Sequence, residues 1–505
     1  MDKINSKSNP IRIEKKLDLL NDFKPTKYND WKEQVIKDLK GSDFNETLKT
    51  LTYEQLELQP IYTKKDLIDL KLTDTDSTLE LFYSAPKSSE TSIGNWEIAQ
   101  SINTDEAGKF HRLLNFGLQN GQSAIIIDEV INKFGANSNL EYLLADTSLD
   151  TASLNIFCGE SIKNILPRLE ILLEKQKLLL KDIRGGIFAS PIAGSIKHGR
   201  LNSDFDKLFE ELYSESNSLF QKNKKLRTIL VDASLYSNAG SNAVQDLAFS
   251  IASGSEYIFR LLNLGGDANQ IASQISFKFG VGSFYFMEIA KLRAARILWS
   301  KILKEYGADI KNRSMHIFAQ TAYYNLTTRD IHNNILRGTT EAFSAIIGGA
   351  NVIDVTPFDA HISEANEFSL HLSRNIQNIL KEESHLDKVV DAAGGSYFIE
   401  NLTEELCRKA WKLFQEVESN GGIIECLKSN FIQNSIEKVN NARINDFKTN
   451  KSILVGVNKF VNEKEVDKSE VGYGCNSADA TQEEKAYDFI PIACKRAARQ
   501  IEINK

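Results

Sequence analysis

The side chains best suited to metal binding and proton transfer in this sequence are its seven histidines and five cysteines. The histidines are His111, His198, His316, His332, His361, His371 and His385. None of them stands in a His-x-x-x-His or His-Glu-x-x-His arrangement, so their spacing does not indicate a zinc site. The cysteines are Cys158, Cys407, Cys426, Cys475 and Cys494. Their odd number and the lack of Cys-x-x-Cys spacing favour reduced thiols over a disulfide framework.

Glycine pairs mark three places where a backbone loop could hold a phosphate: Gly265-Gly266, Gly348-Gly349 and Gly394-Gly395. None of them forms a Gly-x-Gly-x-x-Gly loop or a P-loop, and no Ser-His-Asp set can be assigned from sequence order alone. The chain carries 61 Lys plus Arg and 68 Asp plus Glu, a net charge of −7, without a basic block. Nucleic acid is therefore not an expected partner.

The amino-terminal stretch MDKINSKSNPIRIEKKLDLLNDF is charged and lacks the continuous apolar segment of a signal peptide. No later run is long and apolar enough to cross a bilayer. Together with the expected reduced cysteines, these features predict a cytoplasmic protein that does not associate with membranes.

A strand that runs directly into a helix is expected over residues 279–299. Apolar residues recur there at helical spacing, at Tyr285, Ile289, Leu292, Ala295 and Trp299. Glu288, Lys291 and Arg293 lie off this stripe. We therefore expect one buried face and a second face on which the charged side chains reach water or a partner.

Short β-rich runs alternate with amphipathic helices from residue 96 onward. The candidate strands are 96–100, 124–128, 154–158, 186–190, 228–234, 275–279, 316–321 and 352–356. The helices between them are expected at 105–117, 162–180, 204–222, 243–262, 284–306 and 330–347. Such alternation predicts parallel strands with crossover helices, and eight repeats favour a closed barrel. The sequence thus predicts an α/β fold, a (β/α)8 TIM barrel with its functional groups at the carboxyl ends of the strands.

Helical segments are expected on both sides of this barrel. Residues 28–41 predict a helix with Asn29 or Asp30 as its cap, Trp31 on its apolar face and Gly41 at its end. After the barrel, helices are expected at 362–381, 403–421 and 495–503, and a strand at 454–460. We divide the chain into an N-terminal helical arm (1–92), the barrel (93–382) and a C-terminal helical extension and tail (383–505).

Three stretches carry a resemblance to a known family: FMEIAKLRAAR at 286–296, GGSYFIE at 394–400 and LVGVNKF at 454–460. With the order Trp31, Gly41, Pro60-x-Tyr62 near the start, they resemble the methylmalonyl-CoA mutase family of adenosylcobalamin-dependent acyl-CoA mutases over residues 28–460. The resemblance implies an acyl-CoA mutase-like barrel. It also implies that residues 1–92 include a region that contacts another subunit.

In that family a separate α/β domain usually holds the corrinoid, and its Asp-x-His-x-x-Gly loop supplies the histidine that ligates cobalt. The most similar string here is Asp359-x-His361, which ends in Glu364 where the family has glycine. About 45 residues follow Phe460, too few for an α/β domain of typical size. We therefore expect no cobalamin-binding domain and no adenosylcobalamin on this chain.

The resemblance also locates the residues of the family's barrel site. Ser101 stands where the family has a tyrosine between corrin and substrate, and Ser234 and Leu235 stand where it has a Tyr-His pair. That histidine bonds the thioester carbonyl, a bond that leucine cannot donate, and loss of such a donor costs on the order of 10²–10³ in rate. Gln320 is retained, and Asn351 replaces a glutamine near the CoA chain. These two residues are candidate remnants of a substrate-binding site.

Two further strands carry apolar or small residues where the family has polar ones. The fourth strand has Gly186-Ile187-Phe188 in place of Thr-x-Gln, and the seventh has Phe318 in place of a histidine. The resemblance therefore implies the small subunit of a heterodimeric mutase, a subunit without catalytic residues of its own. The large subunit would bind adenosylcobalamin and the acyl-CoA, and the complex would interconvert (R)-methylmalonyl-CoA and succinyl-CoA.

Two alternatives stay open. A catalytic barrel could receive adenosylcobalamin from a separate small protein in trans, but other residues would then have to take the roles lost at Ser101 and Leu235. The second alternative is a scaffold or chaperone-like partner without a part in turnover. Chaperones of these mutases generally carry a P-loop, and this sequence has none.

Overall fold

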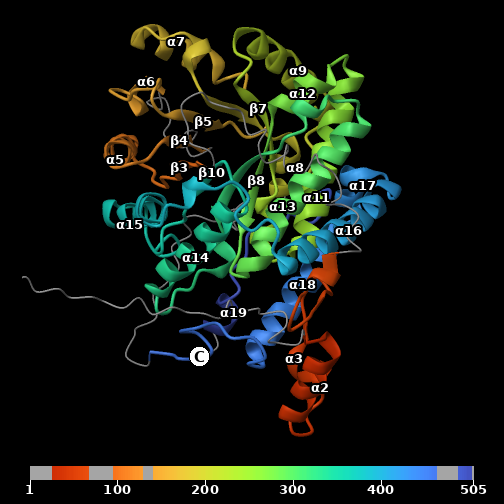
Figure 1. Ribbon diagram of the computed structural model, residues 1–505. Coiled ribbons are helices and arrows are strands. Elements are labelled where there is room, and N and C mark those ends of the chain that lie inside the picture. The colour runs from red at the N-terminus through yellow and green to blue at the C-terminus, as the bar shows by residue number, and fades with distance from the viewer. Residues whose placement is uncertain (1–25, 68–94, 129–139, 463–486, 503–505) are drawn as a thin grey trace, which may run out of the picture. The chain divides into compact units, whose positions relative to one another are not determined.

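The computed structural model describes residues 26–67, 95–128, 140–462 and 487–502 (Figure 1). The chain forms two compact units, residues 1–61 and residues 62–505. The smaller unit contains the helices α2 (Tyr28–Asp38) and α3 (Phe44–Leu48) and the short antiparallel strands β1 (Thr50–Leu51) and β2 (Glu57–Leu58). The larger unit contains the barrel and the helices that follow it.

The helix α2 confirms the expected helix near the amino terminus but begins differently. Its cap is Lys27, not Asn29 or Asp30, and the carboxylate of Asp30 accepts a hydrogen bond from the Lys27 N–H at 3.1 Å. Gly41 follows the helix with φ of +100°, a left-handed conformation that favours glycine. No residue of α2 is buried within the described part of the chain, and Trp31 touches the buried Phe44 edge-on at 6.2 Å between ring centroids.

The larger unit is built around a closed barrel of eight parallel strands in the order β10-β3-β4-β5-β6-β7-β8-β9. The strands are β3 (Glu97–Gln100), β4 (Ala124–Ile127), β5 (Ser153–Phe157), β6 (Gly185–Ala189), β7 (Arg227–Asp232), β8 (Ile275–Val281), β9 (His316–Thr321) and β10 (Val352–Asp354). Pairing of β10 with β3, with Val352 opposite Glu97 and Asp354 opposite Ala99, closes the sheet. The predicted TIM barrel is therefore confirmed.

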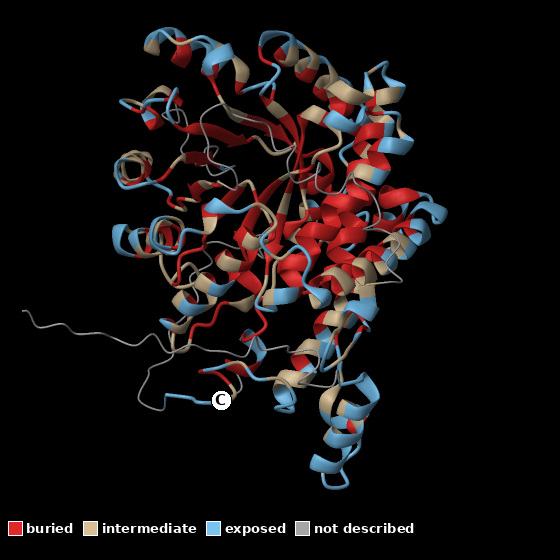
Figure 2. Ribbon diagram, in the orientation of Figure 1, coloured by how far each residue is buried: buried red, intermediate tan, exposed pale blue. Residues whose placement is uncertain are grey.

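Helices connect successive strands, and α15 (Glu367–Asn378) follows the last of them. Figure 2 shows buried residues concentrated in the strands and in the faces of the helices that touch them. The connecting helices are α5 (Ala107–Gln119), α6 (Leu140–Leu143), α7 (Leu166–Gln176), α8 (Pro191–His198), α9 (Phe205–Lys222), α10 (Ser234–Asn238), α11 (Ala243–Asn263), α12 (Ala268–Gln274), α13 (Tyr285–Glu305) and α14 (Asn333–Ile347). No helix in the described ranges is long and apolar enough to cross a membrane.

The middle of α13, from Met287 to Trp299, is buried on all sides, so its charged residues reach partners inside the protein and not water. The exposed fractions of Glu288, Lys291 and Arg293 are only 8%, 1% and 6%. A second layer causes this burial, because α16 (Tyr397–Ser419) packs over α13 and α11 from outside the barrel. The charged residues of α13 therefore need partners inside the protein.

The carboxyl-terminal part of the larger unit is mainly helical, with α16, α17 (Gly422–Lys428), α18 (Phe431–Lys448) and the short α19 (Arg499–Glu502). The strand expected at 454–460 is wrong. This segment is a turn around Gly456, whose φ is +82°, with a single bridge between Val455 and Lys459. The side chain of Asn458 accepts from the Leu454 N–H at 2.7 Å and so takes the place of a partner strand.

The described cysteines are not all reduced thiols. Cys158, Cys407 and Cys426 are reduced thiols, as expected, whereas Cys494 is disulfide-bonded. The expectation of reduced cysteines is therefore wrong at Cys494. Cys475 lies outside the described residues.

Candidate functional site

The carboxyl end of the barrel brings Ser101 and Gln320 together around a third residue, Asp354. The Ser101 hydroxyl donates to Asp354 Oδ2 at 2.5 Å, and Gln320 Nε2 donates to the same oxygen at 2.9 Å. The Ser101 N–H donates to Asp354 Oδ1 at 3.2 Å. Burial raises the pKa of Asp354 although these donors act against the rise. The site therefore holds a carboxylate whose oxygens are already occupied by donors from β9 and from the end of β3.

Sequence reasoning identified Ser101 and Gln320 but missed Asp354. The available signal was strand alternation: β9 and β10 pair with Gln320 opposite Asp354, and residues two apart on a strand share a face. Val352 belongs to the cluster inside the barrel, so Asp354 faces the same interior at the carboxyl end.

The next candidate positions, Ser234 and Leu235, lie at the start of α10, just after β7. Both the N–H and the hydroxyl of Ser234 donate to Asp232 Oδ1, at 3.2 and 2.5 Å. Leu235 is half-buried and has no side-chain donor. The Ser234 hydroxyl is thus committed to a neighbouring carboxylate, and the adjacent position offers only hydrocarbon.

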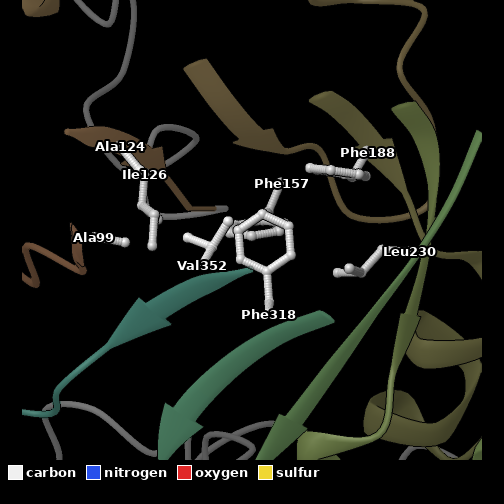
Figure 3. Packing of buried hydrophobic residues seen from close by; sticks show 8 residues of the cluster. All are labelled: Ala99, Ala124, Ile126, Phe157, Phe188, Leu230, Phe318 and Val352. Carbon is white, nitrogen blue, oxygen red and sulfur yellow. The ribbon is translucent and has the colours of Figure 1, made fainter. Parts of the chain in front are cut away.

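Three phenylalanines project into the barrel interior, as Figure 3 shows. The ring centroids of Phe157, Phe188 and Phe318 lie 5.5, 5.7 and 5.7 Å apart, and the exposed fractions of the three residues are 7%, 1% and 3%. The other members of the cluster are Ala99, Ala124, Ile126, Leu230 and Val352. At this level the barrel axis is occupied by packed apolar side chains.

The glycine of the fourth barrel strand makes room for one of these rings. A Cβ atom at Gly186 would lie 2.2 Å from the ring of Phe188, closer than any real contact. A threonine at 186 and a phenylalanine at 188 therefore cannot occupy these conformations together. The two departures from the Thr-x-Gln pattern are physically coupled.

Lys278 of β8 adds a positive charge between the filled interior and the carboxyl end. Its Nζ lies 5.4 Å from the ring centroid of Phe157, and its charge acts on Asp354. Lys278 is half-buried, and the sequence analysis did not select it. The polar groups at this end of the barrel thus pair mainly with one another.

Asn351 does not join this site. It precedes β10 and therefore lies at the amino end of the barrel, at the opposite end of the strand from Asp354. Its side-chain oxygen accepts from the Ile317 N–H at 2.8 Å. The structure gives Asn351 a backbone-bonding role there and does not bring it near Gln320.

His361 lies in the turn between β10 and α15, because the helix expected from residue 362 begins only at Glu367. Its Nε2 lies 3.2 Å from the carbonyl oxygen of Tyr323, whereas Asp359 Oδ2 accepts from Asn366 Nδ2 at 2.9 Å. Metal-binding histidines usually donate their second nitrogen to a carboxylate or carbonyl and keep the first free for the metal. His361 meets a carbonyl in this way, but the Asp359 carboxylate accepts from Asn366, and Glu364 stands where the cobalt-binding loop has glycine. Within the described ranges, no group of three or more His, Cys, Asp or Glu side chains is placed to hold a metal ion.

The charged residues of α13 form an ionic cluster next to the end of β8. Lys291 Nζ lies 3.0 Å from Asp246 Oδ2, 2.6 Å from Glu288 Oε2 and 2.8 Å from the Gly280 carbonyl oxygen. Burial lowers the pKa of Lys291, but the two carboxylates outweigh it and the net pKa is raised. Lysine therefore stays charged in a position with an exposed fraction of 1%. The partners of Lys291 stabilise the packing of α13 against α11 and β8.

Glu341 of α14 lies near the same cluster, and its carboxyl group holds its proton more strongly than an ordinary glutamate does. Burial raises its pKa to about 8, and Asn325 Nδ2 donates to its carboxyl group at 2.9 Å. At neutral pH the protonated form of Glu341 is therefore substantially populated. This buried titratable group was not selected by the sequence analysis.

Arg293 joins two of the stretches that carry the family resemblance. Its Nε donates to Asp391 Oδ1 at 2.8 Å, and its Nη2 donates to Glu400 Oε1 at 2.9 Å. Glu400 Oε1 also accepts from the Gly395 N–H at 2.8 Å. The FMEIAKLRAAR helix thus holds the GGSYFIE segment in place through a buried ion pair.

Comparison with known proteins supports one family. The family model described as methylmalonyl-CoA mutase matches residues 134–497. The methylmalonyl-CoA mutase small subunit of Porphyromonas gingivalis is 33% identical over 96% of this chain and 77% of its own length. The small subunit of Propionibacterium freudenreichii is 29% identical over 88% of this chain and 70% of its own length. The large subunit of Porphyromonas gingivalis is 28% identical over 81% of this chain, which covers 60% of that protein.

Proposed function

Because the chain belongs to the methylmalonyl-CoA mutase family, we propose that it is the small subunit of a heterodimeric mutase and that a larger homologue carries the reaction. The names of the relatives support this proposal. One organism, Porphyromonas gingivalis, has both a small and a large subunit similar to this chain. The complex would interconvert (R)-methylmalonyl-CoA and succinyl-CoA, with this subunit supporting the large one.

The observation that carries the proposal is the filled barrel. Phe157, Phe188 and Phe318 occupy the interior, and Gly186 is the residue that lets the Phe188 ring lie there. A thioester substrate lying along the barrel axis would have to displace these packed rings. Packed interiors resist such displacement, because loss or overpacking of large side chains costs several kcal/mol.

The polar groups at the carboxyl end support the same conclusion. The hydroxyls of Ser101 and Ser234 donate to Asp354 and Asp232, so neither is available to a substrate without breaking a bond to a carboxylate. Leu235 cannot donate to a thioester carbonyl. Gln320 is bonded to Asp354, and a role for it in acyl-CoA binding stays a prediction.

We place adenosylcobalamin on the large subunit. When bound there, the cofactor would supply the radical that starts the carbon-skeleton rearrangement. On this chain, the Asp359 carboxylate is bonded to Asn366, and Glu364 stands where the cobalt-binding loop of the family has glycine, which supports this placement.

The first experiment is co-expression of this chain with the homologous large subunit of its own organism, followed by native mass spectrometry and a turnover assay. We expect a one-to-one complex that converts methylmalonyl-CoA with added adenosylcobalamin, and no turnover by this chain alone. If this chain instead binds only a small cobalamin-carrying protein and turns over with it, the barrel itself is catalytic and the proposal is wrong.

We expect α2 to contact the partner, because within the smaller unit Trp31 and Val35 form an apolar face that is only partly covered. We predict that Trp31→Asp weakens the complex at least tenfold, because a charge replaces an aromatic anchor. The matched control is Glu33→Lys on the same helix, at an exposed position off that face. Equal affinity of the Trp31→Asp variant and the wild type would exclude α2 from the interface.

A further inference from the structure

Residues 487–502, which we call the strap, run along the carboxyl end of the barrel. Five backbone N–H groups of the strap donate to carbonyl groups of the larger unit. Asp488 and Phe489 bond Gly199, Ile492 bonds Ile196, Lys495 bonds Asn238, and Ala497 bonds Tyr324. The accepting carbonyls belong to the connections that follow β6, β7 and β9. The strap therefore contacts three of the loops on the face where barrel proteins bind ligands.

The side chains of the strap are built into the protein. Phe489, Ile492 and Ile501 are buried, with exposed fractions of 3%, 7% and 6%. Ala498 and Ile501 form an apolar cluster with Val457, and Phe447 of α18 packs against it. Figure 1 shows α18 and α19 side by side, in agreement with their mutual contacts. The strap is therefore anchored by buried side chains at intervals, with exposed residues between them.

A buried ion pair fixes the last turn of the strap. Arg496 Nη1 contacts Glu502 Oε2, and the exposed fractions of the two side chains are 5% and 6%. Glu502 Oε1 accepts from the N–H groups of Thr328 and Arg329, at 2.9 and 3.3 Å. These two residues belong to the loop after β9, the strand that carries Gln320. The strap thus ends on the loop that borders the Ser101, Gln320 and Asp354 site.

We propose that the strap occupies the face on which a corrinoid-carrying α/β domain would have to dock, and so keeps such a domain off this barrel. A cofactor delivered to the Ser101, Gln320 and Asp354 site must approach the carboxyl end of the barrel, because that end presents the connecting loops. The strap covers this approach on the side of β6 to β9 with the protein's own chain. The inference rests on the proposed function, since it explains how a barrel of this family avoids competing with its partner for the cofactor domain.

The test releases the strap in the full-length chain. The double variant Arg496→Met and Glu502→Gln removes both charges of the buried pair with little change in volume, so neither charge is left buried alone. A second variant, Phe489→Ala, loosens the opposite end of the strap. The matched control is Glu437→Gln, which breaks the exposed pair between Glu437 and Lys495.

Two quantities are measured for each variant. Hydrogen exchange of the strap amides reports whether the strap is released, and we expect at least a tenfold increase in both strap variants with no change in the barrel strands or in the control. Binding to a separately expressed corrinoid-binding domain of a mutase of this family, loaded with hydroxocobalamin, reports whether the face opens. We expect at least a tenfold gain in affinity on release.

Three results would overturn the proposal: unchanged exchange of the strap amides in both variants, faster exchange without a gain in binding, or binding by the wild type as tight as by the variants. The proposed function fails separately, if no heterodimer with a larger homologue forms on co-expression. A strap that proves irrelevant to docking would leave that heterodimer intact.

Discussion

Replacing Lys291 with alanine tests whether α13 carries a buried charge cluster or a solvated face. The ammonium group lies 3.0 Å from Asp246 and 2.6 Å from Glu288, with an exposed side-chain fraction of 1%. Removing one partner of a buried ion pair leaves the other charges without compensation and costs about 3–5 kcal/mol. A lysine on a solvated face would cost about 0.5 kcal/mol or less.

Lys301 provides the matched control, because it lies in the same helix and is exposed. Urea unfolding followed by tryptophan fluorescence and far-ultraviolet circular dichroism gives the free energy of unfolding of both variants. We expect Lys291→Ala to lose about 3–5 kcal/mol relative to wild type and Lys301→Ala to stay within about 0.5 kcal/mol. Equal stabilities of the two variants would refute the buried cluster.

The pH dependence of the free energy of unfolding gives a second, independent test of the buried cluster. Burial already raises the pKa of Glu288, and loss of the Lys291 charge raises it further. A carboxyl group with a higher pKa in the folded than in the unfolded state binds more protons when folded, so stability falls as pH rises between the two pKa values. The defect of Lys291→Ala should therefore be larger at pH 8 than at pH 5. A defect that does not change with pH would contradict this explanation.

Three further predictions concern Glu341, Arg293 and Phe318. Glu341 has a folded-state pKa of about 8, far above its unfolded value. Between pH 4.5 and 7, the free energy of unfolding of the wild type should therefore fall by about 3 kcal/mol more than that of Glu341→Gln, as measured by urea unfolding. Parallel pH profiles would contradict this. Arg293→Met leaves Asp391 and Glu400 without their shared cation, and limited proteolysis should cut the segment around residues 387–396 at least tenfold faster than in wild type; unchanged cleavage would show that other contacts hold it. Phe318→Ala should lower the free energy of unfolding by about 3–5 kcal/mol in urea titrations, and a loss below about 1 kcal/mol would mean that the interior is not tightly packed.

The barrel strands were predictable because each is a short β-rich run between helical segments. The strand His316–Thr321 has the predicted bounds, whereas β10 ends at Asp354 and not at residue 356. The difference has a local cause. The Thr356 N–H donates to the Thr321 side-chain oxygen at 2.8 Å, and the Thr356 hydroxyl donates to the Thr321 carbonyl oxygen at 2.7 Å. These bonds replace strand pairing, so β10 ends before Thr356. A side-chain substitute for a ladder bond is not visible in a hydrophobic pattern.

The parts that could not be predicted depend on contacts between distant segments. Helical periodicity located α13, but the helix that covers its outer face, α16, begins about 100 residues later in the chain. In the same way, Ser101 and Asp354 are 253 positions apart, and only closure of the barrel brings them together. The failed strand at 454–460 has enough β-forming residues but no partner, and Gly456 with Asn458 forms a turn. Sequence pattern identified the elements, whereas the partners of their polar side chains came from the topology.

The pairing of β3 with β10 delays closure of the barrel until most of the chain has been synthesised. The two strands whose pairing closes the sheet, with Val352 opposite Glu97, are separated by about 250 residues. At ribosomal rates of about 5–20 residues per second, roughly 10–50 s pass between synthesis of the first strand and of the last. During that time β3 exposes unpaired backbone groups along one edge, which other chains can use for pairing. Overproduced protein should therefore aggregate through nascent chains that have not yet reached residue 354, and slower growth at low temperature with added chaperones should raise the soluble yield.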